Sequence, residues 1–231
     1  MIHFKSNEIH VWVVPLLIYE PEIEGLRSLL SPDEIQRAYR LKTNLHQTRF
    51  IIAHGILRKI ISFYVNLLPD QLIFQYSTYQ KPYLPSPYTD LQFNMSHSHD
   101  YAAFAITQHA AIGIDIEKIL PIQHQEIANR YFSQKENLAI SALAKAEQSY
   151  AFYRIWSRKE AIIKAIGKGL SMPLDSFTVA SDDQVENILV EDKTWSLAPI
   201  HINSEYTGAV ACEKSIENIL YCDFSAQIKQ V

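Results

Sequence analysis

The chain has 231 residues, of which 48% are hydrophobic and 20% are charged, and its formal net charge is −4. This composition is typical of a globular protein and not of a disordered one, and the small negative charge gives no reason to expect a nucleic-acid partner. No apolar run approaches the roughly 20 residues that a membrane-spanning helix needs, and Glu8 and His10 interrupt the apolar N-terminal segment. We therefore expect a cytoplasmic protein with no membrane contact.

The N-terminal half alternates strand-like and helix-like patterns. Ser31-Pro32-Asp33-Glu34 combines a capping serine, a proline at the first helical position and a glutamate that completes a capping box, so it predicts a helix start. Apolar residues three and four apart predict a long helix from residue 44 to 66. The remaining predicted elements are strands over residues 10–18, 71–76, 91–96 and 101–106, a proline-rich loop over 79–88, and a polar turn over 97–100.

The C-terminal half repeats this mixture of elements. A second capping box, Ser133 to Glu136, predicts another helix start, and the strongest helical pattern runs from residue 147 to 166 before Gly167. Predicted strands cover residues 111–117, 177–180, 185–190, 194–200, 206–211 and 219–224. The two cysteines, Cys212 and Cys222, lie in strand-like surroundings without metal-ligand spacing, so we expect two free thiols.

Both halves thus contain helices and a small set of strands. This order predicts an α+β fold with two similar, pseudo-symmetric lobes, each with helices packed on a small and mostly antiparallel sheet. We divide the chain into an N-terminal lobe over residues 1–108 and a C-terminal lobe over 109–231. Because a two-lobed chain can hold a whole site between its lobes, we expect a monomer.

The most informative stretch is the strand from Ile112 to Glu117. Side chains alternate between the two faces of a strand, so the three isoleucines point into a core, while Gly113, Asp115 and Glu117 share the other face. Two carboxylates on one face, about 7 Å apart, can share one hard cation, and Gly113 leaves room for a ligand to approach the backbone. The alternative is an ordinary half-buried strand with a polar face.

A second group of polar residues lies on the predicted helix from residue 147 to 166. Glu160 and Lys164 are four residues apart and therefore lie on one helix face. By themselves they can be a surface ion pair worth a few tenths of a kcal/mol. Beside a metal site, Glu160 would add a third carboxylate, and Lys164 would place a positive charge next to a bound phosphate.

The segment Phe93 to Asp100 contains Ser96, His97, Ser98 and His99. A zinc or iron site would need further ligands at definite spacing, and a serine hydrolase of the G-x-S-x-G type would need a motif that is absent. Hydroxyl groups, backbone N–H groups and an imidazole after a strand are instead suited to phosphate.

The segment from residue 27 to 59 is rich in basic residues. It fits either a solvated helix face or a local site for a phosphate-bearing ligand. The basic residues are Arg27, Arg37, Arg40, Lys42, Arg49, Arg58 and Lys59.

Together, in this order and spacing, these segments resemble the surfactin-synthetase-type 4′-phosphopantetheinyl transferases. The resemblance extends from about residue 31 to 212, and its combined motifs are specific although each alone is weak. The matching pieces are Lys81-Pro82, Phe93-Asn94-Met95-Ser96-His97-Ser98, Ile112-Gly113-Ile114-Asp115-Ile116-Glu117, Trp156-Ser157-Arg158-Lys159-Glu160-Ala161 with Lys164, and the run from Gly167 to Phe177.

The resemblance implies transfer of the phosphopantetheine arm of coenzyme A to a serine of an apo carrier protein (acyl or peptidyl), with Mg²⁺ as cofactor and 3′,5′-ADP as the other product. Asp115, Glu117 and Glu160 match the magnesium ligands of that family, and Glu160 is also a candidate general base. Lys164 and His97 would supply positive charge in catalysis.

The resemblance also implies where the phosphates of coenzyme A are bound. Ser96 and His97 match residues that contact these phosphates, and Lys164 matches the lysine beside the pyrophosphate. Lys81 matches a ligand of the 3′-phosphate, with Arg37 and Arg49 as further basic contacts to it.

Three positions depart from the family pattern in the region that the resemblance assigns to nucleotide binding. Gln80 stands where glycine usually precedes Lys-Pro, so the loop on the adenine side is expected to differ in shape. Glu34 stands where a cationic residue can occur, and we interpret it as a helix-cap residue. Phe50 replaces a hydroxyl-bearing residue that can contact phosphate.

Two other classes of function stay open at the level of sequence. A metal-dependent phosphohydrolase would use the same carboxylates, lysine and histidine with water as the acceptor. A non-catalytic module that binds coenzyme A or a carrier protein has no need of the three acids, so their presence argues against it.

Overall fold

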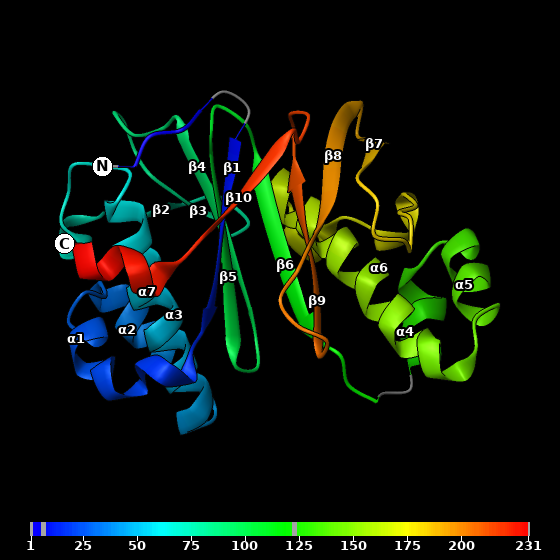
Figure 1. The fold of residues 1–231 in the computed structure, drawn as a ribbon, viewed down its shortest axis with the longest axis horizontal. Coiled ribbons are helices and arrows are strands. Elements are labelled where there is room, and N and C mark those ends of the chain that lie inside the picture. The colour runs from blue at the N-terminus through cyan, green and yellow to red at the C-terminus, as the bar shows by residue number, and fades with distance from the viewer. Residues whose placement is uncertain (1, 6–7, 122–123, 231) are drawn as a thin grey trace.

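The computed structural model describes residues 2–5, 8–121 and 124–230. They form two four-stranded sheets that pack together in the middle of the molecule, with helices on the outer side of each sheet (Figure 1). The predicted α+β class is therefore confirmed. No helix among these described residues is long and apolar enough to cross a bilayer.

The first sheet has the strand order β10-β1-β5-β4. Strand β5 is antiparallel to both β1 and β4, whereas β10 is parallel to β1. Helix α3 covers this sheet with α1 beside it, and Ile56 and Ile60 of α3 pack in one core with Trp12 and Phe104 of the sheet. Helix α2 packs on α3, where Ala38 joins a small cluster with Ile51. The bounds of these elements are β1 Glu8–Pro15, α1 Ile23–Arg27, α2 Pro32–Tyr39, α3 Asn44–Ser62, β4 Leu91–Ser98, β5 Tyr101–Gln108 and β10 Asn218–Cys222.

The second sheet has the order β6-β9-β8-β7, and its neighbouring strands are antiparallel. Phe152 and Ile162 of α6 pack against Leu197 and Ala209 of the sheet, and α4 and α5 lie beside α6 (Figure 1). Helix α6 ends where predicted, because Gly167 adopts the left-handed conformation with a φ of 81°. The bounds are β6 Ile112–Lys118, α4 His124–Tyr131, α5 Gln134–Ser141, α6 Lys145–Ile166, β7 Glu186–Val190, β8 Lys193–Ile200 and β9 Tyr206–Cys212.

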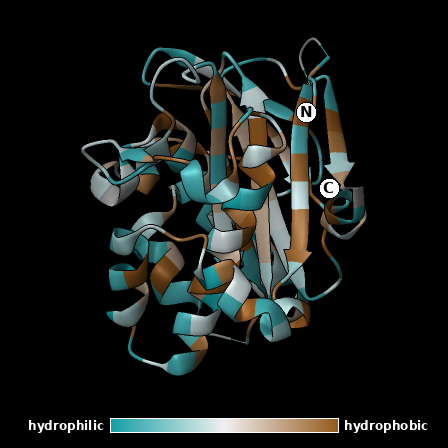
Figure 2. Ribbon diagram, turned by 90° about the vertical axis from the view of Figure 1, so that its left-hand side faces the viewer, coloured by the Kyte–Doolittle hydropathy of each residue, from teal (hydrophilic) through white to brown (hydrophobic). Residues whose placement is uncertain are grey.

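A third apolar core lies between the two sheets. It contains Ile112, Ile114 and Ile116 of β6 together with Val11 of β1 and Ala105 of β5, so the predicted alternation of side chains along β6 is confirmed. Figure 2 shows hydrophobic residues (brown) along the strands, whereas the outer helices carry both hydrophobic and hydrophilic residues, as expected for helices with one face in solvent.

The role predicted for Gly113 is wrong. A Cβ atom at this position would lie 2.1 Å from the carbonyl oxygen of Ala161 and 2.3 Å from the amide nitrogen of Ala165. The space that glycine leaves is therefore filled by the backbone of α6 and not by a ligand. Glycine allows the helix to pack directly on the strand that carries Asp115 and Glu117.

Several short elements differ from the sequence expectations. The predicted strand over residues 71–76 is reduced to β2 (Gln75–Tyr76), which pairs with β3 (Pro82–Tyr83) inside the predicted loop. The predicted strand over residues 177–180 does not form, because the N–H of Val179 donates to the Glu136 carboxylate (2.8 Å) and not to a neighbouring strand. Helix α4 was not predicted.

The turn after β4 is shorter than predicted. His97 and Ser98 belong to the strand, and the turn consists of residues 99 and 100, with His99 at a φ of 51°. The side chains of Ser96, His97 and Ser98 are therefore held by a paired strand.

The end of the chain returns to the first sheet. Strand β10 pairs with β1, and Phe224 of α7 (Phe224–Gln227) belongs to the core of the N-terminal half. In Figure 1 this segment, in red, crosses from the second sheet to the helices on the left. Residues 218–230 thus pack with the first sheet, although the division at residue 108 groups them with the second. As expected, Cys212 and Cys222 are free thiols.

Candidate active site

A polar hollow of about 320 Å³ lies where β4, β6 and α6 meet. Residues from three segments that the sequence analysis considered separately line this hollow. The lining residues are Met95, Ser96, His97, Asp115, Glu117, Trp156, Glu160 and Lys164.

The spacing along α6 explains which residues of this helix face the hollow. Trp156, Glu160 and Lys164 follow one another at intervals of four and therefore share one helix face. The residues between them, including Arg158 and Lys159, are buried on other faces. Glu160 and Lys164 thus lie on one face of the helix, as predicted.

Asp115 lies at the bottom of this arrangement and is only 3% exposed. Its Oδ1 accepts hydrogen bonds from Lys164 Nζ (2.6 Å) and Ser96 Oγ (2.8 Å), and Lys164 also donates to Ser96 Oγ (3.0 Å). Burial raises the pKa of Asp115, and the neighbouring Lys164 and Ser96 oppose that effect. The second oxygen, Oδ2, is buried and has no hydrogen-bond partner, which is unusual for a carboxylate oxygen.

The other two acids of the hollow are also hard to ionise. Burial, followed by the charge of Asp115, raises the pKa of Glu117 to about 7, even though Ser98 Oγ donates a hydrogen bond to its Oε2 (2.9 Å). Burial and Asp115 also raise the pKa of Glu160. Three acids that oppose one another's ionisation are typical of a site that a cation completes.

The acids of the hollow have the donor atoms of a metal site but are not gathered around one point. Among the residues that the structure describes, no group of three or more His, Cys, Asp or Glu side chains is gathered closely enough to hold one as it stands. The donor chemistry nevertheless fits a hard cation, because the three acids offer oxygen atoms only and Oδ2 of Asp115 is buried without a partner. In this structure the positive charge beside Asp115 is that of Lys164.

His97 lies at the rim of the hollow on β4. Desolvation by the surrounding protein, followed by the positive charges of His54, Lys164 and Arg49, lowers the pKa of His97 to about 4. The lowered pKa favours the neutral imidazole in the ligand-free protein, although His97 is exposed to solvent. The role predicted for His97 in catalysis uses the cationic form. An anionic ligand among the same positive charges would offset them and favour protonation of His97.

Lys81 lies beside the hollow but is already hydrogen-bonded. Its ammonium group donates to the carbonyl oxygens of Ile112 (2.9 Å) and Ala165 (3.0 Å), and burial lowers its pKa to about 8. An ammonium group has three N–H donors, so one remains for a ligand. Lys81 also lines a second hollow of about 220 Å³, which shares Met95 and Lys164 with the first.

The two predicted arginine contacts lie outside the residues that line either hollow. Arg49 forms an ion pair with Asp100 in the turn after β4. The guanidinium carbon of Arg37 lies 5.1 Å from the centre of the Tyr76 ring. Neither contact uses all five N–H donors of a guanidinium group, so both arginines keep donors that a phosphate can accept.

Two of the positions that depart from the family pattern lie close together. Glu34 caps α2 as predicted, since its carboxylate accepts from the N–H of Ser31 (2.9 Å). It also forms a buried ion pair with Arg58 (2.6 Å) and contacts His54 (3.3 Å), whose ring stacks on Phe50 at 3.8 Å.

The third departure is in the loop before Lys81. Gln80 has a φ of 66°, in the left-handed region that glycine adopts at the lowest cost. A backbone conformation typical of glycine therefore occurs here with a glutamine.

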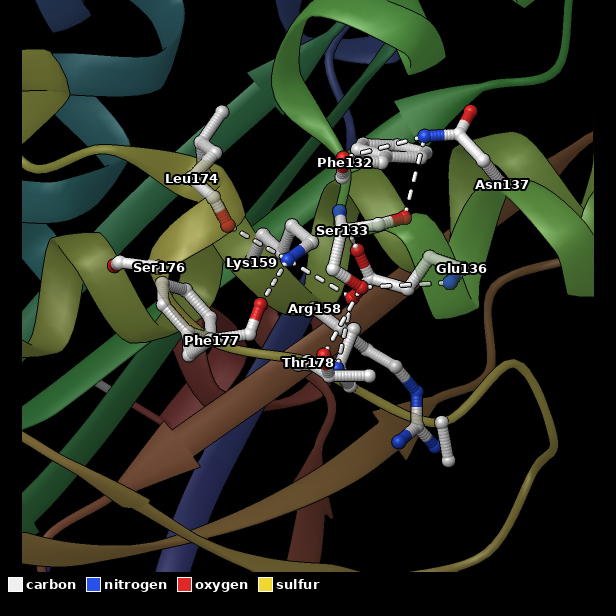
Figure 3. Close-up of polar contacts among 12 residues, drawn as sticks. Phe132, Ser133, Glu136, Asn137, Arg158, Lys159, Leu174, Ser176, Phe177 and Thr178 are labelled. Carbon is white, nitrogen blue, oxygen red and sulfur yellow. Dashed lines mark hydrogen bonds and ion pairs between the residues drawn. The ribbon is translucent and has the colours of Figure 1, made fainter.

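The sequence did not reveal the role of Lys159, whose side chain is completely buried. It lies among Glu136, Leu174 and Phe177 (Figure 3). It forms an ion pair with Glu136 of α5 (2.8 Å) and donates to the carbonyl oxygens of Leu174 (2.7 Å) and Phe177 (2.6 Å). These contacts fix α6 against the segment that follows it. An available signal was that Lys159 occupies a helical position with apolar neighbours at i+3 and i+4.

Fold and site together define an α+β protein with an acidic, lysine-containing hollow suited to chemistry on a phosphate group. Comparison with known families gives a match to the 4′-phosphopantetheinyl transferase superfamily over residues 111–212 and to the N-terminal region of 4′-phosphopantetheinyl transferases over residues 19–109.

Individual relatives are similar over most of the chain. The 4′-phosphopantetheinyl transferase HetI of Nostoc sp. (strain PCC 7120) is 34% identical over 209 residues, which is 89% of this chain and 88% of the relative. The 4′-phosphopantetheinyl transferase Sfp of Bacillus subtilis (strain 168) is 40% identical over 162 residues, or 69% and 70% of the two chains. The L-aminoadipate-semialdehyde dehydrogenase-phosphopantetheinyl transferase of Mus musculus is 29% identical over 87% of this chain and 74% of its own length.

The chain belongs to the 4′-phosphopantetheinyl transferase superfamily. The resemblance predicted from its motifs is thereby confirmed.

Proposed function

We propose that this protein transfers the 4′-phosphopantetheine group of coenzyme A to a serine hydroxyl of an apo carrier protein, with Mg²⁺ as cofactor and 3′,5′-ADP as the second product. The observation that carries the proposal is the hollow in which Asp115 and Glu117 of β6 meet Glu160 and Lys164 of α6. Membership of the superfamily supports the same activity. The cytoplasmic location and the monomeric state stay predictions from the sequence.

The metal ion would be held by Asp115, Glu117 and Glu160, whose oxygen ligands suit Mg²⁺. When bound, it would supply positive charge to the diphosphate of coenzyme A. Lys164, Ser96 and His97 would contact the same phosphate groups. We also propose Lys81, Arg37 and Arg49 as contacts to the 3′-phosphate.

The reaction balances without a nucleophile from the enzyme. The serine oxygen of the carrier protein forms a bond to the β-phosphorus of coenzyme A, the bond from that phosphorus to the bridging oxygen breaks, and 3′,5′-ADP leaves. Lys164 would stabilise the negative charge that develops on the phosphate oxygens. Glu160 would accept the serine proton, directly or through water.

Intact-mass analysis of carrier proteins tests the proposal. Apo carrier proteins of the fatty-acid, polyketide and nonribosomal-peptide types are each incubated with enzyme, coenzyme A and Mg²⁺, with and without EDTA. We expect at least one carrier to gain the mass of one phosphopantetheine group, and EDTA to prevent the gain.

Two outcomes would contradict the proposal. Release of 3′,5′-ADP at the same rate without a carrier protein would identify a phosphohydrolase. Binding of coenzyme A with no product from any of the carrier types would indicate a non-catalytic module.

A further inference from the structure

Strand β6 has one free edge. It pairs with β9 on one side, and among the described residues no strand pairs with its other side. Buried backbone N–H and C=O groups need hydrogen-bond partners, and an unpaired edge exposes a row of them. The edge matters because β6 carries Asp115 and Glu117.

The side chains of Lys81 and of two residues of β4 supply hydrogen-bond partners along this unpaired edge. The carbonyl oxygen of Ile112 accepts from Lys81 Nζ (2.9 Å), and the N–H of Ile114 donates to Asn94 Oδ1 (2.9 Å). Further along the edge, the N–H of Lys118 donates to Ser98 Oγ (3.1 Å). We call this row of contacts the β4–β6 seam.

The seam has the two-residue period of a strand. Asn94, Ser96 and Ser98 alternate along β4, and each contacts β6 at a point that lies further along the strand than the one before. Asn94 and Ser98 contact backbone N–H groups, whereas Ser96 donates directly to the Asp115 carboxylate. The alternate side chains of β4 therefore fix the position of β6 along the direction of β4.

Ser98 differs from the other residues of the seam because its hydroxyl contacts both the edge and an acid. Its Oγ accepts from the N–H of Lys118 and donates to Glu117 Oε2 at 2.9 Å. The other near neighbour of this hydroxyl, Nδ1 of His99, is 3.5 Å away, which is too long to compete with the carboxylate. Ser98 is 8% exposed and is not one of the residues that line the acidic hollow.

We propose that Ser98 is a positioning residue: its hydroxyl joins β4 to the free edge of β6 and holds the Glu117 carboxylate in the orientation that metal binding needs. The part of this proposal that concerns the metal rests on the proposed function. Groups that orient a metal ligand typically change metal affinity by about 10- to 100-fold when they are removed.

The test compares Ser98→Ala with Ser98→Thr. Alanine removes both hydrogen bonds, whereas threonine keeps the hydroxyl. Ser141→Ala is the matched control, because Ser141 is exposed at the end of α5 and its hydroxyl donates to the Asn137 carbonyl (2.8 Å).

Two quantities are measured in the full-length protein. The first is the affinity for Mn²⁺, as a spectroscopic substitute for Mg²⁺, by electron paramagnetic resonance in the presence of coenzyme A. The second is the hydrogen-exchange rate of the Lys118 amide by NMR in metal-free protein.

We expect Ser98→Ala to weaken Mn²⁺ binding about tenfold or more and to increase exchange of the Lys118 amide about tenfold. Ser98→Thr and Ser141→Ala should match wild type in both measurements. Recovery with threonine would exclude a general folding defect as the cause.

The inference and the proposed function can fail separately. Wild-type affinity for Mn²⁺ in a folded Ser98→Ala variant, while Glu117→Gln loses binding, would overturn the inference and leave the proposed function in place. If the wild-type protein binds no Mn²⁺ at all, the metal assignment fails, and unchanged exchange of the Lys118 amide would then overturn the seam as well.

Discussion

The ammonium group of Lys164 lies 2.6 Å from Oδ1 of Asp115, while Oδ2 of the same carboxylate is buried without a partner. One oxygen is thus neutralised by a lysine, and the other is left for a different cation. Lysine and metal ion would therefore act together on Asp115. This relationship makes Asp115 the residue whose charge the site depends on most.

Asp115→Asn should abolish measurable transfer without lowering the thermal stability of the metal-free protein. Burial raises the pKa of Asp115, so keeping it ionised at neutral pH opposes folding, and asparagine removes that charge while it retains an oxygen for Lys164 and Ser96. Intact-mass assays and thermal unfolding measure the two effects. Asp90→Asn is the control, since its side chain is 69% exposed and remote from the hollow. Transfer by Asp115→Asn at the wild-type rate would refute the metal assignment.

Lys81→Ala should weaken binding of coenzyme A more than binding of dephospho-coenzyme A, because only the former carries the 3′-phosphate. The substitution also leaves the carbonyl oxygens of Ile112 and Ala165 without their donor, which we expect to lower the free energy of unfolding by about 1–3 kcal/mol. Calorimetric titration with both ligands separates the two roles. Equal losses of affinity would mean that Lys81 acts only in the β4–β6 seam.

Lys159→Met should lower the free energy of unfolding by about 3–5 kcal/mol, because it leaves the Glu136 carboxylate buried and unpaired. Denaturant unfolding measures this effect. The double variant Lys159→Met/Glu136→Leu should recover much of the loss, since both charges are then removed. If the double variant is no more stable than the single one, the hydrogen bonds of Lys159 to Leu174 and Phe177 matter more than the ion pair.

Glu34 should make the stability of the protein depend on pH in the acidic range. Burial alone would raise its pKa, but hydrogen bonds from His54 and Arg58 lower it to about 2, below the ordinary glutamate value of 4.5. The stabilisation is therefore fully present above about pH 4.5 and is lost as the pH falls towards 2, by about 3 kcal/mol in total. Unfolding free energies between pH 5 and pH 2 should fall less steeply for Glu34→Gln than for wild type. Equal pH dependence in the variant and the wild type would show that ionised Glu34 does not stabilise the fold.

Local sequence patterns predicted the parts of the site that depend on one element at a time. The alternation along β6 and the four-residue spacing of Glu160 and Lys164 follow from strand and helix geometry, and both are found in the structure. The capping box at Ser31 and the left-handed Gly167 are equally local.

Contacts between distant segments were not predictable in the same way. From the sequence, Gly113 was expected to leave space for a ligand. Only the packing of α6 shows that the backbone of Ala161 and Ala165 fills this space. The burial of Lys159 was not predicted, because its partner, Glu136, lies on a different helix. The strand predicted at residues 177–180 has a suitable composition, yet the Glu136 carboxylate takes the hydrogen bond that a sheet would need.

The return of β10 and α7 to the first sheet has a consequence for protein engineering. A gene cut between residues 108 and 109 would give a first fragment in which β1 lacks its neighbour β10. In the second fragment, β10 and α7 would lack the sheet on which they pack. Exchanging half of this enzyme with a relative therefore requires three pieces, in which residues 218–230 come from the same parent as the first 108.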